Sequence, residues 1–138
     1  ESNASVVAMV DGLIVRAGHG AIMEDLDGDG NEQTGWNILY MHVNDLEVKA
    51  GDWVQASDLL GHPSCEGGIA TGTHVHVARK FNGEWISADG PLPFVLSGWT
   101  VHAGNVPYIG TLTKESTIIT SSIYGSGESL IMRVRGAP

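Results

Sequence analysis

Short runs rich in β-branched and aromatic residues alternate with glycine-rich segments along this chain, and apolar residues do not recur at helical spacing. The 19 glycines separate the runs from one another, as turns separate strands. We therefore predict an all-β fold, an antiparallel sandwich or open barrel. The runs that predict its strands are 6–15, 36–43, 53–60, 73–80, 110–119 and 129–135.

The length of 138 residues and the hydrophobic content of 42% are sufficient for one core, so a single domain over residues 1–138 is expected. An Asn82-Gly83 turn and a long ordered loop around Pro91-Leu92-Pro93-Phe94 follow the last of the central strands. The strands beyond this loop, within 87–138, are expected to close one edge of the sheet.

The formal net charge of −9 argues against nucleic-acid partners and anionic membranes, because both require clustered lysine and arginine. No apolar run approaches the roughly 18 residues that a transmembrane helix needs. The net charge therefore argues against nucleic-acid and anionic-membrane binding but does not by itself indicate a function.

The strongest chemical signal is the His74-Val75-His76 sequence in a predicted strand. Side chains on a strand alternate between its faces, so the two imidazoles are expected to point the same way. They could share a metal ion, or one could bind the metal while the other transfers protons. The alternative is a pair of solvent-facing histidines. A third histidine, His42, ends an upstream aromatic strand.

Four segments of the chain occur in the order and spacing of a known family. They are Tyr40-Met41-His42-Val43, Val48-Lys49-Ala50-Gly51-Asp52-Trp53-Val54, Leu60-Gly61-His62 and Thr71-Gly72-Thr73-His74-Val75-His76-Val77. Over about 7–85, within a motif-bearing core of about 6–86, the chain resembles the lysostaphin-like zinc metallopeptidases. The resemblance implies hydrolysis of peptide cross-links in peptidoglycan or of glycine-rich peptides.

The same resemblance implies roles for individual residues. His76 corresponds to a zinc ligand, and His42 and His74 correspond to catalytic residues that flank the zinc-bound water. Tyr40 and His62 correspond to positions beside the substrate groove. The family's other two zinc ligands come from a His-x-x-x-Asp motif, which this sequence lacks. We expect either that an upstream segment supplies those ligands or that the domain is a degenerate relative without catalysis.

A second candidate metal site is an acidic loop after the first strands. Asp25, Asp27, Asp29 and Asn31 alternate in the spacing of the first half of a calcium loop. The twelfth position is Trp36 instead of glutamate, which rules out a complete EF-hand loop. A solvated acidic hairpin loop without calcium is the alternative.

Cys65 is the only cysteine and lies in a glycine-rich segment. We expect a disulfide to a partner cysteine in another chain or in an upstream segment. A buried free thiol is the alternative.

Together these features predict a secreted or cell-envelope peptidase domain whose active site is incomplete within this chain. Two other hypotheses remain. The domain could be a non-catalytic module that binds cell-wall peptide or a protein partner, or it could be an extracellular structural protein stiffened by calcium.

Overall fold

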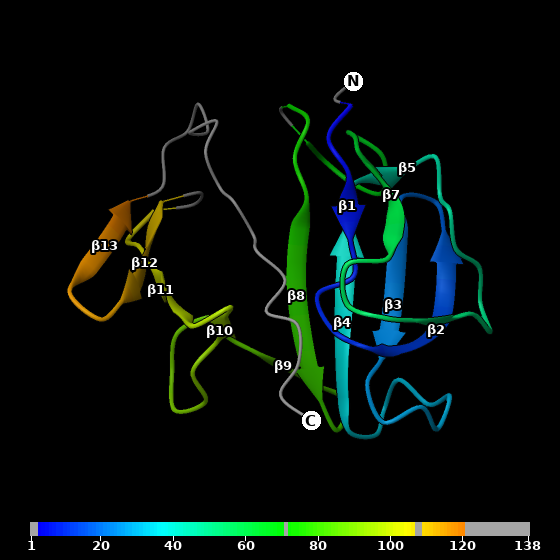
Figure 1. The fold of residues 1–138 in the computed structure, drawn as a ribbon, viewed down its shortest axis with the longest axis horizontal. Coiled ribbons are helices and arrows are strands. Elements are labelled where there is room, and N and C mark those ends of the chain that lie inside the picture. Colours follow the sequence, from blue (N-terminus) through cyan, green and yellow to red (C-terminus); the bar gives the residue numbers. More distant parts are fainter. Residues whose placement is uncertain (1–2, 71, 107–108, 121–138) are drawn as a thin grey trace. The chain divides into compact units, whose positions relative to one another are not determined.

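The computed structural model describes residues 3–70, 72–106 and 109–120, and every regular element among them is a β-strand (Figure 1). This confirms the all-β prediction. The chain divides into two compact units, residues 1–86 and residues 87–138, and each is considered by itself.

The first unit contains two antiparallel sheets. The larger has six strands in the order β6-β2-β3-β4-β8-β9, and the smaller has three in the order β1-β7-β5. The bounds of the larger sheet are β2 Gly12–Gly18, β3 Ala21–Asp25, β4 Trp36–Met41, β6 Trp53–Val54, β8 His76–Phe81 and β9 Glu84–Ile86. Those of the smaller are β1 Val6–Val7, β5 Val43–Asn44 and β7 Leu59–Pro63.

The two sheets of the first unit share one hydrophobic core. Side chains from both contribute to it, so the unit is a sandwich, with the short strands lying over β3 and β4 (Figure 1). Burial of these side chains is the main favourable contribution to its stability. The buried members are Val6, Ala8, Ile14, Ile22, Ile38, Tyr40, Val43, Val54 and Leu60.

Two tight turns set the register of the large sheet. His19 and Gly20 join β2 to β3 with φ of 51° and 77°, and Asn82 and Gly83 join β8 to β9 with φ of 47° and 82°. Positive φ at both central residues is the type I′ geometry, whose twist matches that of paired strands. The Asn82-Gly83 turn is where the sequence predicts it.

Two predicted strands of the first unit are divided in the structure. The run 6–15 becomes β1 and β2, because the chain turns before Gly12. The run 53–60 becomes β6 and β7, because Asp58 N–H bonds to the Gln55 carbonyl at 2.9 Å and closes a turn through Ser57, which has a φ of 79°. In both cases the halves belong to different sheets. A continuous apolar run does not reveal such a break.

Residues 87–138 form a sheet of their own among the residues described. It is an antiparallel meander in the order β10-β11-β12-β13. The bounds are β10 Val95–Leu96, β11 Trp99–Ala103, β12 Gly110–Lys114 and β13 Thr117–Thr120. The described strands of this unit pair with one another, and the expectation that strands within 87–138 close an edge of the first sheet stays a prediction. The run 110–119 is a hairpin that turns at Glu115, where φ is 53°. The strand predicted over 129–135 lies outside the described residues.

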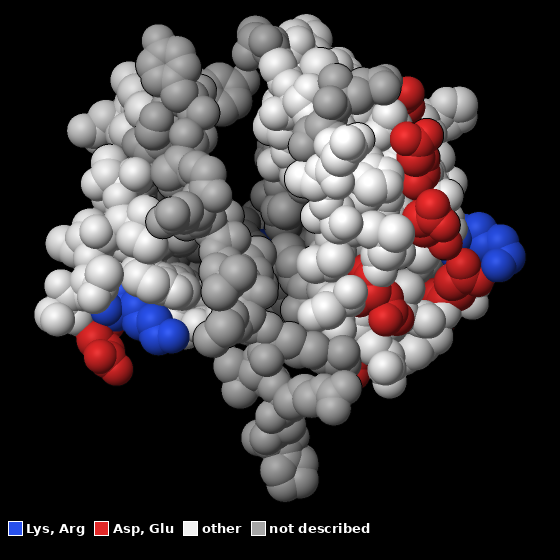
Figure 2. Space-filling view, turned by 45° about the horizontal axis from the view of Figure 1, so that its top comes forward, with Lys and Arg blue, Asp and Glu red and all other residues white. Residues whose placement is uncertain are grey.

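Figure 2 shows a column of acidic side chains along one side of the first unit, with few basic side chains nearby. This distribution accords with the net charge of −9. In the part of the chain that the structure covers, no helix is long and apolar enough to cross a membrane.

Candidate active site

Three imidazoles meet at one end of the large sheet. The ring centroids of His42 and His74 are 4.5 Å apart, and those of His42 and His76 are 6.5 Å apart. His42 follows β4, His76 begins β8, and Met41 pairs with His76 across these neighbouring strands. His74 lies before β8 in an isolated β-bridge to Ser64. The structure therefore brings together the three histidines that the sequence predicts.

Backbone carbonyls orient two of the three rings. Nδ1 of His42 lies 2.7 Å from the Glu66 carbonyl oxygen, and Nδ1 of His74 lies 2.8 Å from the Gly72 carbonyl oxygen. A carbonyl oxygen only accepts hydrogen bonds, so Nδ1 carries the proton in each ring. In the neutral ring the lone pair is then on Nε2. His42 is also 4% exposed, so its ring is held rigidly.

The segment 64–68 supplies the carbonyl that holds His42. Ser64 N–H donates to the His42 carbonyl at 2.7 Å, and Glu66 N–H donates to Ser64 Oγ at 3.0 Å. The segment packs on the β2–β3 turn so closely that a Cβ at Gly20 would lie 2.5 Å from the Gly67 nitrogen. Only glycine at position 20 allows this approach. The turn therefore positions His42 indirectly.

Tyr40, which the resemblance places beside the substrate groove, is buried in the core of the first unit. It is 1% exposed, and its hydroxyl donates to Glu24 Oε2 at 2.6 Å and accepts from Met9 N–H at 2.9 Å. The reason is strand alternation: Tyr40 pairs with Val77 and points into the core, whereas Met41 pairs with His76 on the opposite face. Its structural role is to hold β4 against the core.

Sequence reasoning missed Glu24, which is fully buried on β3. Burial raises the pKa of its carboxyl to about 7, the Tyr40 hydrogen bond lowers that pKa, and the charge of Asp11 raises it further. Burial also raises the pKa of the Tyr40 hydroxyl, and the neighbouring Glu24 adds to that increase. Strand alternation could have revealed its burial, because Glu24 lies two residues after Ile22 and therefore on the same, core-facing side of β3.

The other predicted site residues lie in β7, in the segment 64–68 and in the loop between β3 and β4. His62 lies in β7, where its Nδ1 is 2.8 Å from the Ala4 carbonyl oxygen and holds the segment before β1. Cys65 is exposed. Asp25, Asp27 and Asp29 come together in the loop between β3 and β4.

A family model of peptidase family M23 matches residues 1–88. The chain belongs to peptidase family M23. Protease LasA from Pseudomonas aeruginosa is 34% identical to this M23 domain over 64 residues, which cover 41% of the chain and 15% of LasA. Lysostaphin from Staphylococcus simulans is 34% identical over 114 residues, which cover 78% of the chain and 21% of lysostaphin. The M23 domain thus spans less than a quarter of these relatives.

The solved structure of pseudoalterin, an M23 metalloprotease from the deep sea, shares the fold. Its TM-score is 0.71 at 24% identity, and the match covers 87% of this chain and 71% of pseudoalterin. The sandwich of the M23 domain is therefore the fold of a metalloprotease of the same family.

Zinc, which the resemblance implies, needs three protein ligands in a catalytic site. Within residues 3–70, 72–106 and 109–120, one group of three or more His, Cys, Asp or Glu side chains has ligand atoms close enough to hold a metal, and it is the aspartate group of the β3–β4 loop. The imidazoles of His42, His74 and His76 do not form such a group. The described residues of the M23 domain therefore do not fit a complete zinc site.

Proposed function

We propose that the full-length protein that contains this domain is a secreted zinc peptidase that cleaves peptide cross-links of peptidoglycan or glycine-rich peptides. The observation that carries the proposal is the convergence of His42, His74 and His76 in an M23 fold. The names of the relatives, lysostaphin and protease LasA, support a peptidase.

His76 is the zinc ligand in this proposal, because it corresponds to the second histidine of the family's His-x-His motif. The remaining ligands come from a His-x-x-x-Asp segment of the full-length protein outside this chain. The described residues supply no replacement for that segment.

His42 and His74 handle protons in the proposed reaction. The Nδ1 atom of each ring is held by a carbonyl, so Nε2 is the nitrogen that transfers protons in this proposal. In its neutral form, Nε2 accepts a proton from the attacking water. Once protonated, the same nitrogen donates a hydrogen bond to the oxyanion that develops on the scissile carbonyl. Two rings 4.5 Å apart can divide these tasks between them.

The proposal extends to His62 and Cys65. His62 is taken to border the substrate groove, as the resemblance implies. Cys65 is exposed and is proposed to form a disulfide with a cysteine of another segment or chain, which suits an oxidising compartment outside the cell. Comparison of intact mass before and after reduction of the native protein would detect the lost partner.

A second function is favoured by the incomplete zinc site. A domain that keeps the histidines without the other ligands could bind wall peptides or a protein partner in the same place and cleave nothing. This binding module and the peptidase differ in one measurable respect, the release of new peptide termini.

The test uses the full-length protein with purified peptidoglycan and a glycine-rich peptide as substrates. The peptidase predicts cleavage that stops on chelation and returns with zinc. His74→Ala should slow turnover by roughly 10²–10⁴-fold, as for a lost proton-transfer or oxyanion partner. The matched control is His102→Ala, because His102 is bonded to Thr113 Oγ1 in the second unit, and it should retain activity. Binding without cleavage, with His74→Ala changing affinity alone, would establish the binding module instead.

A further inference from the structure

The loop between β3 and β4 gathers carboxylates away from the three imidazoles. Asp25, Asp27 and Asp29 each present an oxygen within 4.8 Å of the others. Their spacing, with Gly30 next, is that of a calcium loop's first half. Asp27 and Asp29 are exposed, whereas Asp25 is fully buried where β3 ends.

Two buried oxygens beside this loop have no hydrogen-bond donor. Oδ1 of Asp25 and Oδ1 of Asn37 are both buried and unpartnered, and both residues are 0% exposed. The other atom of each side chain is satisfied, since Asp25 Oδ2 accepts from Gly30 N–H at 2.8 Å and Asn37 Nδ2 donates to the Thr34 carbonyl at 3.0 Å. That second bond fixes which end of the amide is the oxygen.

Asp25 and Asn37 are register partners on adjacent strands, so their side chains lie side by side on one face of the sheet. Two acceptors cannot satisfy each other, and a buried acceptor without a donor destabilises the folded state. A hydrogen-bond donor could satisfy them, but only a cation would also neutralise the three neighbouring carboxylates.

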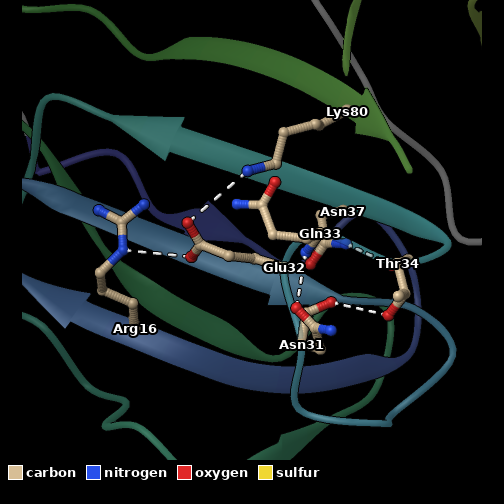
Figure 3. Close-up of polar contacts among 7 residues, drawn as sticks. All are labelled: Arg16, Asn31, Glu32, Gln33, Thr34, Asn37 and Lys80. Atoms are coloured by element: carbon tan, nitrogen blue, oxygen red, sulfur yellow. Dashed lines mark hydrogen bonds and ion pairs between the residues drawn. The ribbon is translucent and has the colours of Figure 1, made fainter. Parts of the chain in front are cut away.

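The second half of the loop is fixed to the sheet by a different acid. Figure 3 shows Glu32 between Arg16 and Lys80, with Glu32 Oε2 3.3 Å from Arg16 Nε and Oε1 3.6 Å from Lys80 Nζ. Glu32 is therefore occupied and does not complete a cation site. The Asn31 side chain is exposed and its oxygen accepts from Gln33 N–H at 3.0 Å, so it is not a buried oxygen without a donor as that of Asn37 is.

The three carboxylates of the loop repel one another, and a bound cation would relieve that repulsion. Burial raises the pKa of Asp25, and the nearby charges of Asp27 and Asp29 add to this. The pKa of Asp29 is lowered, first by its hydrogen bond from Thr34. A proton on Asp25 Oδ1 would relieve part of the repulsion and make that oxygen a hydrogen-bond donor for Asn37 Oδ1, but it would leave the charges of Asp27 and Asp29 uncompensated.

We propose that this loop binds one Ca²⁺ ion through carboxylate oxygens of Asp25, Asp27 and Asp29 and the side-chain oxygen of Asn37. Water fills the remaining positions, since calcium takes 6–8 oxygen ligands. A donor set made only of oxygens favours calcium over zinc. Asn37 thus replaces Asn31 of the sequence-based hypothesis.

Calcium at this site would tie β3 to β4. Asn37 and Met41 lie four residues apart on β4 and so face the same side, and Met41 pairs with His76. The ion would therefore stiffen β4, which leads into His42, without contacting the imidazoles. This proposal does not depend on catalysis, and its test measures binding alone.

Terbium is a suitable probe because it replaces calcium and its emission is sensitised by nearby tryptophan. Trp53 is close to the loop, since a Cβ at Gly28 would lie 3.1 Å from Trp53 Cζ3. Titration of the 138-residue chain with Tb³⁺ should give saturable emission that Ca²⁺ displaces. Thermal melts should shift upward with Ca²⁺ relative to a chelator.

Asp27→Asn is the test variant, because it keeps Oδ1 as the acceptor for Asp29 N–H but removes one charge. The Ca²⁺ concentration needed to displace Tb³⁺ should rise at least about tenfold, because calcium affinity depends on the number of charged ligands.

Asp45→Asn is the matched control. Asp45 is exposed in another loop with a φ of 46°, which asparagine tolerates, so this variant should bind Ca²⁺ as the wild type does. Circular dichroism of both variants in chelator should match the wild type. Superimposable melts with and without Ca²⁺, or equal Ca²⁺ affinity of wild type and Asp27→Asn, would overturn the proposal.

Discussion

At the scale of single residues, the buried Glu24 carboxyl makes stability depend on pH. Its pKa rises from 4.5 to about 7 on folding, so the folded protein binds more protons than the unfolded chain between these values. Stability from this group is complete at low pH and is lost as pH rises toward about 7, by roughly 3 kcal/mol.

Glu24→Gln should remove this slope, because glutamine does not titrate. The measurement is the free energy of unfolding by urea across that pH range for both proteins. Subtracting the free energy of unfolding of the variant from that of the wild type at each pH removes the contributions of the remaining acids. A wild type and variant with parallel pH profiles would show that Glu24 titrates normally.

Tyr40→Phe removes the hydroxyl that joins Glu24 to Met9 N–H. Both partners then lose a hydrogen bond in the interior, so we expect a loss of about 1–3 kcal/mol in the free energy of unfolding. Equilibrium urea denaturation would measure it. If Tyr40 instead served only at a substrate groove, the variant would unfold at the wild-type urea concentration.

The clustering of His42, His74 and His76 could be predicted from the sequence, because their motif order resembles a family with a known site. The core position of Tyr40 could have been predicted from the alternation between Tyr40 and Met41 along the strand. The roles of Glu24 and Asn37 could not be predicted, because these roles depend on which residues the two side chains face on neighbouring strands. Sequence spacing carries no such pairing information.

At the scale of elements, the β2–β3 turn is predicted to control the orientation of His42. In Gly20→Ala, the new methyl group would collide with backbone atoms of Gly67, so the segment that carries the Glu66 carbonyl must move. We expect a loss of about 2 kcal/mol or more and a change in the imidazole signals of His42 in nuclear magnetic resonance spectra.

Gly51→Ala is the matched control for backbone strain. Gly51 has a φ of 96°, and a Cβ there would meet nothing within 4 Å. This variant should lose less stability and leave the His42 signals unchanged. Equal effects of the two substitutions would mean that strain in φ, and not the contact with Gly67, accounts for the glycine at position 20.

The strands that could be predicted are those bounded by a recognisable turn, as β8 is by Asn82-Gly83. The sequence did not predict β1 and β2 as separate strands, because together they form one apolar run. It did not predict β3, because the acidic end of β3 obscures the strand pattern. The division of such runs between two sheets depends on packing of the whole sandwich, which local patterns do not encode.

At the scale of the whole molecule, the first unit is predicted to fold without the second. Every member of the buried hydrophobic cluster lies between Val6 and Leu60, within residues 1–86. A chain that ends at Ile86 should therefore unfold in one cooperative thermal transition near that of the 138-residue chain. Absence of a cooperative transition in the shorter chain would show that residues 87–138 contribute to the core.

The central claim is that His76 binds the metal of an M23 peptidase while His42 and His74 act on protons. The most direct test is the zinc content of the full-length protein and of its His42→Ala, His74→Ala and His76→Ala variants, measured by mass spectrometry of the metal after dialysis. We expect stoichiometric zinc in the wild type, in His42→Ala and in His74→Ala, and loss of zinc in His76→Ala. Zinc retained by His76→Ala, or absent from the wild-type protein, would contradict it.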